Sequence, residues 1–150
     1  MRFIPLPLPD AYLIELAPRE DERGSFARTW CRSAAAEHGI DVDWVQANVS
    51  FNRRAGTLRG MHYQAEPHAE DKLVRCTRGA VYDVLIDLRP ASPTFCRWTA
   101  VELSETNGRQ VFIPQGFAHG FQTLADNTEV SYLMSAPYDA EAARGVRWDD

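Results

Sequence analysis

The chain has 150 residues, of which 45% are hydrophobic and 25% charged, so we expect one domain over residues 1–150 with a single core. Sixteen basic and twenty-one acidic residues give a formal charge of −5, which argues against a surface that binds nucleic acid. No stretch approaches the roughly 18 to 20 apolar residues that cross a bilayer, and residues 1–10 do not resemble an export signal. The three cysteines form no CxxC pair. We therefore expect a cytoplasmic protein with reduced thiols and no membrane partner.

The predicted elements are nearly all short strands. Alternating or β-branched runs are separated by Gly, Pro, Asn or Asp. They cover residues 11–16, 24–30, 43–52, 72–79, 80–89, 95–104, 109–114, 119–125 and 128–136. The one helical pattern is short, over residues 33–38, with Ser33 as a candidate N-cap and Gly39 as its stop. Many short strands at regular spacing predict an all-β sandwich or barrel.

Gly79 separates two of these runs. The step across it indicates a tight hairpin between residues 72–79 and 80–89. The second run is almost continuously apolar, which predicts a strand that is buried on both faces.

The stretch GRQVFIPQGFAHGF has the spacing G-x5-P-x-G-x2-H, which is typical of the second motif of cupin barrels. Gly108, Pro114, Gly116 and His119 occupy its fixed positions. The pattern describes a strand, a turn that needs Pro and Gly dihedral angles, and a returning strand that points His119 into the barrel mouth. The alternative is a packed histidine with one satisfied ring nitrogen.

The first cupin motif is altered in this chain, which reads GTLRGMHYQAEPH. Metal-binding cupins carry H-x-H and then a glutamate, whereas Gln64 stands at the second histidine and His68 at the glutamate. A neutral amide is a poor ligand for Zn or Fe compared with imidazole. We therefore predict no metal and no cofactor, and chemistry that depends on protein acids and bases.

Candidate acids and bases gather around His62. A histidine with a pKa of about 6.5 can remove a proton from carbon at neutral pH, provided that a cation such as Lys72 stabilises the enolate oxygen. Tyr132, on a later strand, can return a proton to the opposite face. Strand alternation puts Arg59 and His62 on different faces unless Gly60 or a bulge re-aims the strand. The alternatives are a solvated lysine and a half-buried structural tyrosine.

Several longer motifs run in order along the chain. They are DERGSF, VQANVSFN, LRGMHYQ, KLVRCTRGAVYDVLIDLR, SPTFCRWTAVELS, RQVFIPQGFAHGF, Y-L-M and GVRWDD. Over the span from about Asp21 to the last residue the chain resembles the dTDP-4-dehydrorhamnose 3,5-epimerase family. The resemblance implies an all-β cupin jelly-roll barrel with one or two short helices, and a metal-free homodimer. It also implies that the protein epimerises nucleotide-linked 4-keto-6-deoxy sugars at C3, C5 or both through an enolate, in deoxysugar and glycan biosynthesis.

The resemblance also implies roles for individual residues. His62 matches the base, Tyr132 the opposing acid and Lys72 the cation beside the 4-keto oxygen. Arg23 matches an arginine that holds phosphate, often across the dimer interface. The residues expected to bind substrate are Arg23, Phe26, Arg28, Gln46, Asn48, Arg59, Gln64, His119 and Tyr138.

Arg28 departs from the family pattern R-G-x-F-x-E, in which the glutamate accepts a hydrogen bond from thymine. Arginine has donors only, so Arg28 cannot accept the N3 proton of thymine, but it can donate to acceptors on guanine or cytosine. Two hypotheses follow: the enzyme prefers a GDP- or CDP-linked sugar, or Arg28 points away and another group reads the base.

The final Trp148-Asp149-Asp150 corresponds to a W-N-D motif after which family members continue, and the aspartate that usually partners the histidine lies in that continuation. A carboxylate behind an imidazole fixes its tautomer and raises its basicity. Asp83 is the expected substitute, the alternative being a buried structural acid. Two rival functions stay open on this evidence: a sugar-nucleotide 3,4-ketoisomerase, and a non-catalytic sugar-nucleotide-binding cupin.

Overall fold

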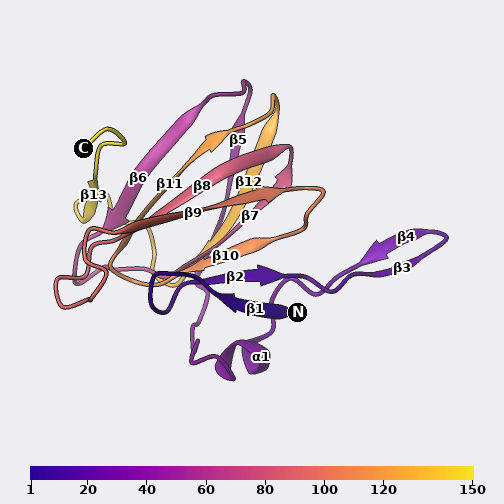
Figure 1. The fold of residues 1–150 in the computed structure, drawn as a ribbon, viewed down its shortest axis with the longest axis horizontal. Helices are drawn as coiled ribbons and strands as arrows, with labels where there is room; N and C mark the ends of the chain where they lie inside the picture. Colours follow the sequence, from indigo (N-terminus) through magenta and orange to yellow (C-terminus); the bar gives the residue numbers. More distant parts are fainter.

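Two antiparallel sheets pack face to face in the computed structural model, which describes residues 1–150 (Figure 1). The strands of the first sheet, in spatial order, are β1 (Arg2–Pro5), β2 (Tyr12–Glu15), β10 (Gln110–Ile113), β7 (Lys72–Arg78), β12 (Thr128–Met134) and β5 (Gln46–Asn52). The strands of the second sheet are β13 (Ala143–Gly145), β6 (Leu58–Gln64), β11 (Phe117–Thr123), β8 (Ala80–Asp87) and β9 (Trp98–Ser104). The predicted all-β jelly-roll architecture is confirmed.

The main core lies between the two sheets. Val74, Val111 and Val130 of the first sheet meet Leu85 and Phe121 of the second in one buried cluster. Alternation along each strand sends these side chains inward. Burial of a side chain of this size contributes about 1.5 to 3 kcal/mol to folding. The inner faces of the same strands continue into the cavity described below.

The single helix, α1 (Arg32–Ala36), lies on the outer side of the first sheet (Figure 1). Ala35 is buried in a second cluster with Phe3, Ile14 and Phe112. The N-cap is Cys31 rather than the predicted Ser33, so the helix begins earlier than its sequence pattern indicates. No helix is long and apolar enough to cross a membrane.

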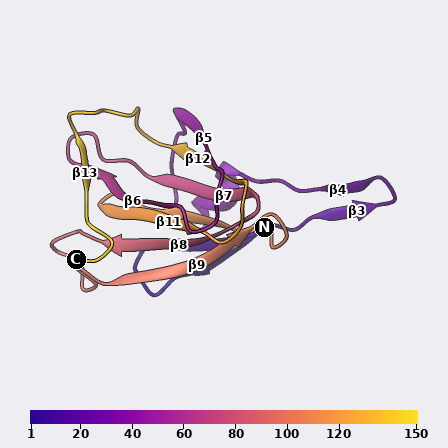
Figure 2. The ribbon, with the colours of Figure 1, turned by 90° about the horizontal axis from the view of Figure 1, so that it is seen from above.

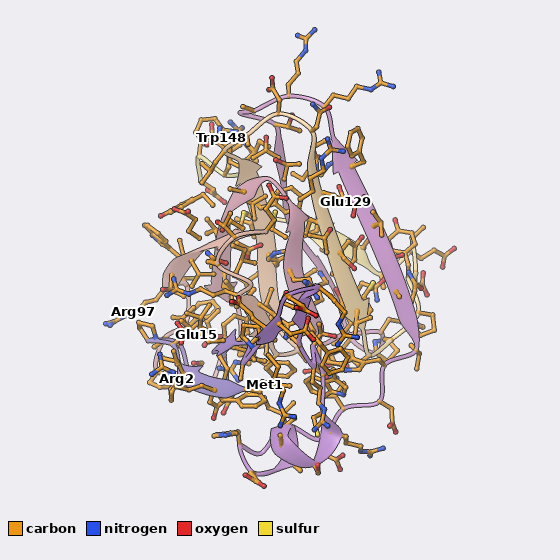
Figure 3. All side chains as sticks on the ribbon, turned by 90° about the vertical axis from the view of Figure 1, so that its right-hand side faces the viewer. Met1, Arg2, Glu15, Arg97, Glu129 and Trp148 are labelled. Carbon is orange, nitrogen blue, oxygen red and sulfur yellow. The ribbon has the colours of Figure 1, made fainter.

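The strands β3 (Arg19–Asp21) and β4 (Gly24–Phe26) form an arm that leaves the barrel (Figure 2). They pair only with each other, and all six of their residues are exposed. In Figure 3, Trp148 lies in the upper part of the molecule and Met1 in its lower part.

The predicted hairpin across Gly79 is wrong. β7 pairs with β10 and β12, whereas β8 pairs with β11 and β9, so Gly79 carries the chain from one sheet to the other. Its φ of +75° is a conformation that glycine adopts without strain. β8 is also buried on one face only, because Val81 and Leu85 lie in the core while Tyr82 is exposed.

Candidate active site

A cavity of about 730 Å³ opens between the inner faces of the two sheets, and β5, β6, β7, β11 and β12 all contribute to its wall. The predicted site residues that line it are Arg59, His62, Gln64, Lys72, His119, Tyr132 and Tyr138. Arg59 and Tyr138, which are 79 positions apart in sequence, therefore share one chamber. The volume falls within the range of about 300 to 1,000 Å³ typical of small-molecule sites.

A bulge lets Arg59 and His62 reach the same cavity. His119 on β11 pairs with His62, but Phe121 pairs with Arg59, so the register shifts between the two pairs. An extra residue on one strand reverses the alternation beyond it. Gly60 makes this possible: its φ is +111°, and a Cβ there would lie 2.5 Å from Cα of Gly120. The re-aimed strand is one of the two arrangements that the sequence left open.

The imidazole of His62 is accessible from the cavity. Partial burial lowers its pKa below the ordinary value, and the positive charges of Lys72, His119 and Arg59 lower it further. The ring is therefore mainly neutral near pH 7, which is the form that accepts a proton.

The phenol of Tyr132 has the opposite tendency. Burial raises its pKa, and the neighbouring charge of Arg59 offsets only part of this rise. The hydroxyl therefore keeps its proton at neutral pH and can act as a donor. A neutral base and a protonated acid face the same cavity.

Asp83 does not partner His62, contrary to expectation. Its two carboxylate oxygens lie 3.0 and 2.9 Å from Nε2 of His119, and both residues are buried. Nε2 of His119 thus donates its proton to the carboxylate, which fixes the orientation of that ring. The correction follows from register: β8 and β11 are neighbours, so inward side chains of the two strands meet.

Lys72 is buried at the start of β7. Its Nζ lies 2.8 Å from Oε1 of Glu70 and donates to the backbone oxygen of His62 at 3.4 Å. Glu70 also lines the cavity, although it was not among the predicted residues. Its position two residues before Lys72, on the same side of an extended chain, is the signal that could have indicated it.

Arg59 is held by another residue that the sequence did not single out. Its Nε donates to Oδ1 of Asn52 at 2.6 Å. Asn52 is buried and donates in turn to the backbone oxygen of Thr128. Arg144, on β13, adds a further guanidinium to the cavity wall. The cavity thus gathers cations from several strands, which suits an anionic ligand.

The predicted polar residues of β5 lie beside the cavity rather than in its wall. Gln46 donates to Oδ1 of Asn48 at 3.0 Å and accepts from the backbone N–H of Tyr138 at 2.9 Å. Gln64 donates to the backbone oxygen of His68 and accepts from the backbone N–H of Asp139. These amides hold the segment that carries Tyr138 against the barrel.

No group of three or more His, Cys, Asp or Glu side chains is arranged to hold a metal ion. The candidate ligands His62, His68 and His119 do not converge: the ring of His68 lies 3.4 Å from Asp139, and that of His119 is bonded to Asp83. The donor set therefore does not fit the metal site of a metal-binding cupin.

The three remaining predicted residues lie in the arm or just after it in sequence, and none of them lines the cavity. Arg23 pairs with Asp21 at 2.5 Å, and Phe26 is 73% exposed. Arg28 contacts Sγ of Cys31 at 3.7 Å. One chain alone does not bring these side chains to the base and the acid.

A jelly-roll barrel whose cavity combines a neutral imidazole, a protonated phenol and a buried ammonium group has the composition of a proton-transferring isomerase. The model of the family described as dTDP-4-dehydrorhamnose 3,5-epimerase matches residues 5–150. The chain belongs to this family, and it is an isomerase of the epimerase class.

Two relatives with this family's name match the whole chain, and the chain covers most of the length of each. The chain is 46% identical over 150 residues to the dTDP-4-dehydrorhamnose 3,5-epimerase of Sinorhizobium fredii, with 100% of the chain and 77% of the relative covered. It is 44% identical over 151 residues to the enzyme of Shigella flexneri, with 100% and 83% covered.

Solved structures give the same result. The epimerase of Bacillus anthracis with TDP and PPi bound has a TM-score of 0.97 and 42% identity, with 99% of this chain and 85% of that chain covered. The enzyme of Legionella pneumophila in complex with dTDP-4-keto-L-rhamnose has a TM-score of 0.92 and 36% identity, with 98% and 78% covered.

Proposed function

We propose that the protein epimerises a nucleoside-diphosphate-linked 4-keto-6-deoxy sugar at C3 and C5. The observation that carries the proposal is the meeting of His62, Lys72 and Tyr132 in one cavity. Epimerisation needs a base on one side of a carbon, an acid on the other and a cation at the ketone oxygen, and the three residues are chemically suited to these roles. Relatives with the same fold hold dTDP-linked ligands.

The reaction begins with removal of a proton from a carbon next to the ketone. Neutral His62 takes the proton, the C–H electron pair moves toward the carbonyl, and the oxygen becomes an enolate. The ammonium of Lys72 stabilises the negative oxygen. Tyr132 then donates its proton to the opposite face of the carbon, so the centre is inverted and the ketone re-forms. The imidazolium and phenolate return to their starting forms by proton exchange with water.

The sugar and the diphosphate need separate contacts. Arg59 and His119 line the cavity beside the catalytic groups, and Asn52 and Asp83 fix their orientations. A guanidinium binds phosphate oxygens in a bidentate manner. Arg59 is therefore the residue within the barrel that we assign to the diphosphate.

We infer that the nucleotide is bound by the arm of a second copy in a homodimer. The arm pairs only with itself, and an isolated two-stranded hairpin is marginally stable in water. An exposed Phe26 can stack on a base, and Arg23 can hold phosphate. A partner that packs against the arm would supply the contacts that the chain itself does not.

The three free cysteines favour a reducing cytoplasm as the place of action.

Deuterium wash-in tests the reaction directly. The protein is incubated in heavy water with dTDP-4-keto-6-deoxyglucose, and the proton signals at C3 and C5 are followed by NMR. We expect both signals to disappear with the wild-type protein and to persist with His62→Ala. His68→Ala is the matched control, because His68 lies outside the cavity wall. Binding of the sugar nucleotide without exchange at either carbon would favour a non-catalytic binding protein, and exchange at C3 alone a single-site enzyme.

A further inference from the structure

The ion pair between Glu70 and Lys72 is unusual for its burial. The side chains of Lys72 and Glu70 are only 11% and 3% exposed. Oε1 of Glu70 lies 2.8 Å from Nζ of Lys72, while Oε2 is buried and has no hydrogen-bond partner. Glu70 belongs to the segment that precedes β7, and both residues line the cavity beside His62.

A half-satisfied carboxylate in this position is costly to the fold. Removing a carboxylate from water carries a large penalty unless hydrogen bonds and opposite charges compensate for it. Lys72 is the one charged group paired with Glu70. The carboxylate therefore depends on the ammonium for its compensation. The ammonium in turn belongs to a side chain that is largely withdrawn from water.

We propose that Glu70 is a positioning residue that fixes the ammonium of Lys72 at the point where the enolate oxygen develops. The inference rests on the proposed function. Lysine is a flexible side chain with a mobile point charge, so an unanchored ammonium occupies several rotamers. A cation stabilises a developing oxyanion best when it is in place before the reaction.

The second contact of Lys72 explains why the anchor matters for the base. Nζ also donates to the backbone oxygen of His62, so the anchored ammonium bridges the Glu70 segment and the strand that carries the base. The charge of Lys72 is one of the causes that lower the pKa of His62. Glu70 thereby acts on both the enolate-stabilising cation and the proton acceptor through Lys72, and its Oε2 is buried.

The test is a double-mutant cycle on turnover. We expect Glu70→Gln to lower kcat by about tenfold, less than the roughly 100- to 1,000-fold effect of deleting a preorganised stabilising group, with KM within about threefold of wild type. Glu70→Asp, which keeps the charge, restores part of kcat. In a Lys72→Met background, Glu70→Gln changes the residual rate of proton exchange less than twofold, because its effect passes through the lysine. Glu66→Gln, in the same segment and exposed, is the matched control and leaves kcat unchanged.

Thermal unfolding supplies a second readout that needs no activity. Lys72→Met leaves Glu70 buried without its partner, so we expect a lower Tm, which the added Glu70→Gln substitution recovers. An equal loss of kcat from Glu70→Gln with and without Lys72, an effect on KM alone, or no recovery of Tm would overturn the proposal. If the wild-type protein exchanges no substrate proton, the proposed function fails, and the unfolding cycle still decides whether the two residues act as a pair.

Discussion

The cavity wall and the arm are held in place by different means. β6, β7, β11 and β12 each pair with two neighbouring strands, and their side chains are fixed by register. β3 and β4 pair only with each other. The chain thus brings His62, Lys72 and Tyr132 together in its own cavity wall but leaves Arg23 and Phe26 outside that wall. Variants of the cavity should therefore change turnover, and variants of the arm should change binding.

The largest expected effect comes from Tyr132→Phe in the cavity. Without the phenolic proton, we expect inversion to slow by about 100-fold, while His62 still removes the substrate proton. NMR in heavy water separates the two steps. In this variant, deuterium wash-in should continue while little inverted product forms. Tyr82→Phe, on the outer face of β8, is the control. Equal loss of wash-in and inversion would mean that Tyr132 does not act as the opposing acid.

The arm should respond differently to Arg23→Ala. We expect KM to rise about tenfold with kcat nearly unchanged, because a phosphate contact is lost far from the reacting carbon. If the arm serves a second copy, mixing this variant with His62→Ala restores activity at substrate concentrations well below the raised KM. Half of the dimers are then mixed and each has one intact site of two, so about a quarter of the sites recover. No recovery in the mixture would place the arm and the cavity of a site in the same chain.

The pH dependence sharpens the description of the cavity. For an ordinary histidine with a pKa of about 6.5, the neutral fraction falls roughly tenfold between pH 7.5 and 5.5. Because the pKa of His62 is lowered, we expect kcat/KM to fall by less than this factor over the same interval. The raised pKa of Tyr132 puts the alkaline limb above its ordinary value of about 10.

The same shift has a consequence for stability. Below about pH 6.5 the unfolded chain protonates this histidine before the folded chain does, so the unfolded state binds more protons and the free energy of unfolding falls as pH falls toward the lowered pKa. His62→Gln removes that contribution. Urea unfolding of both proteins at pH 7.5 and 5.5 measures it, and an identical pH response would show that the pKa of His62 is not lowered.

Local patterns predicted much of the fold, and long-range pairing accounts for what they missed. Alternation and turn residues indicated most strands, including β10 and β11 on either side of Pro114 and Gly116. The Gly79 hairpin failed because two adjacent apolar runs fit a hairpin and a crossover between sheets equally well. The register that decides between them depends on partners elsewhere in the chain.

The candidate site divides in the same way. His62, Lys72 and Tyr132 were predicted from motifs and chemistry, and the structure brings them to one cavity. The pairing of Asp83 with His119 was missed because it spans 36 residues and follows from the β8–β11 register. Local pattern cannot assign a buried acid to one of two histidines when both lie on neighbouring inner faces.

Arg28 gives the smallest expected effect and tests the arm most finely. Its side chain carries donors only, and in the chain alone it contacts Cys31 rather than any cavity residue. If it reads the base across the dimer, Arg28→Glu supplies an acceptor for thymine N3 and tightens dTDP relative to GDP by about threefold, the scale of one exposed hydrogen bond. Calorimetric titration with dTDP, GDP and CDP measures the ratio, and Arg53→Glu controls for the change of charge. An unchanged ratio would mean that another group reads the base and that the arm contributes phosphate binding alone.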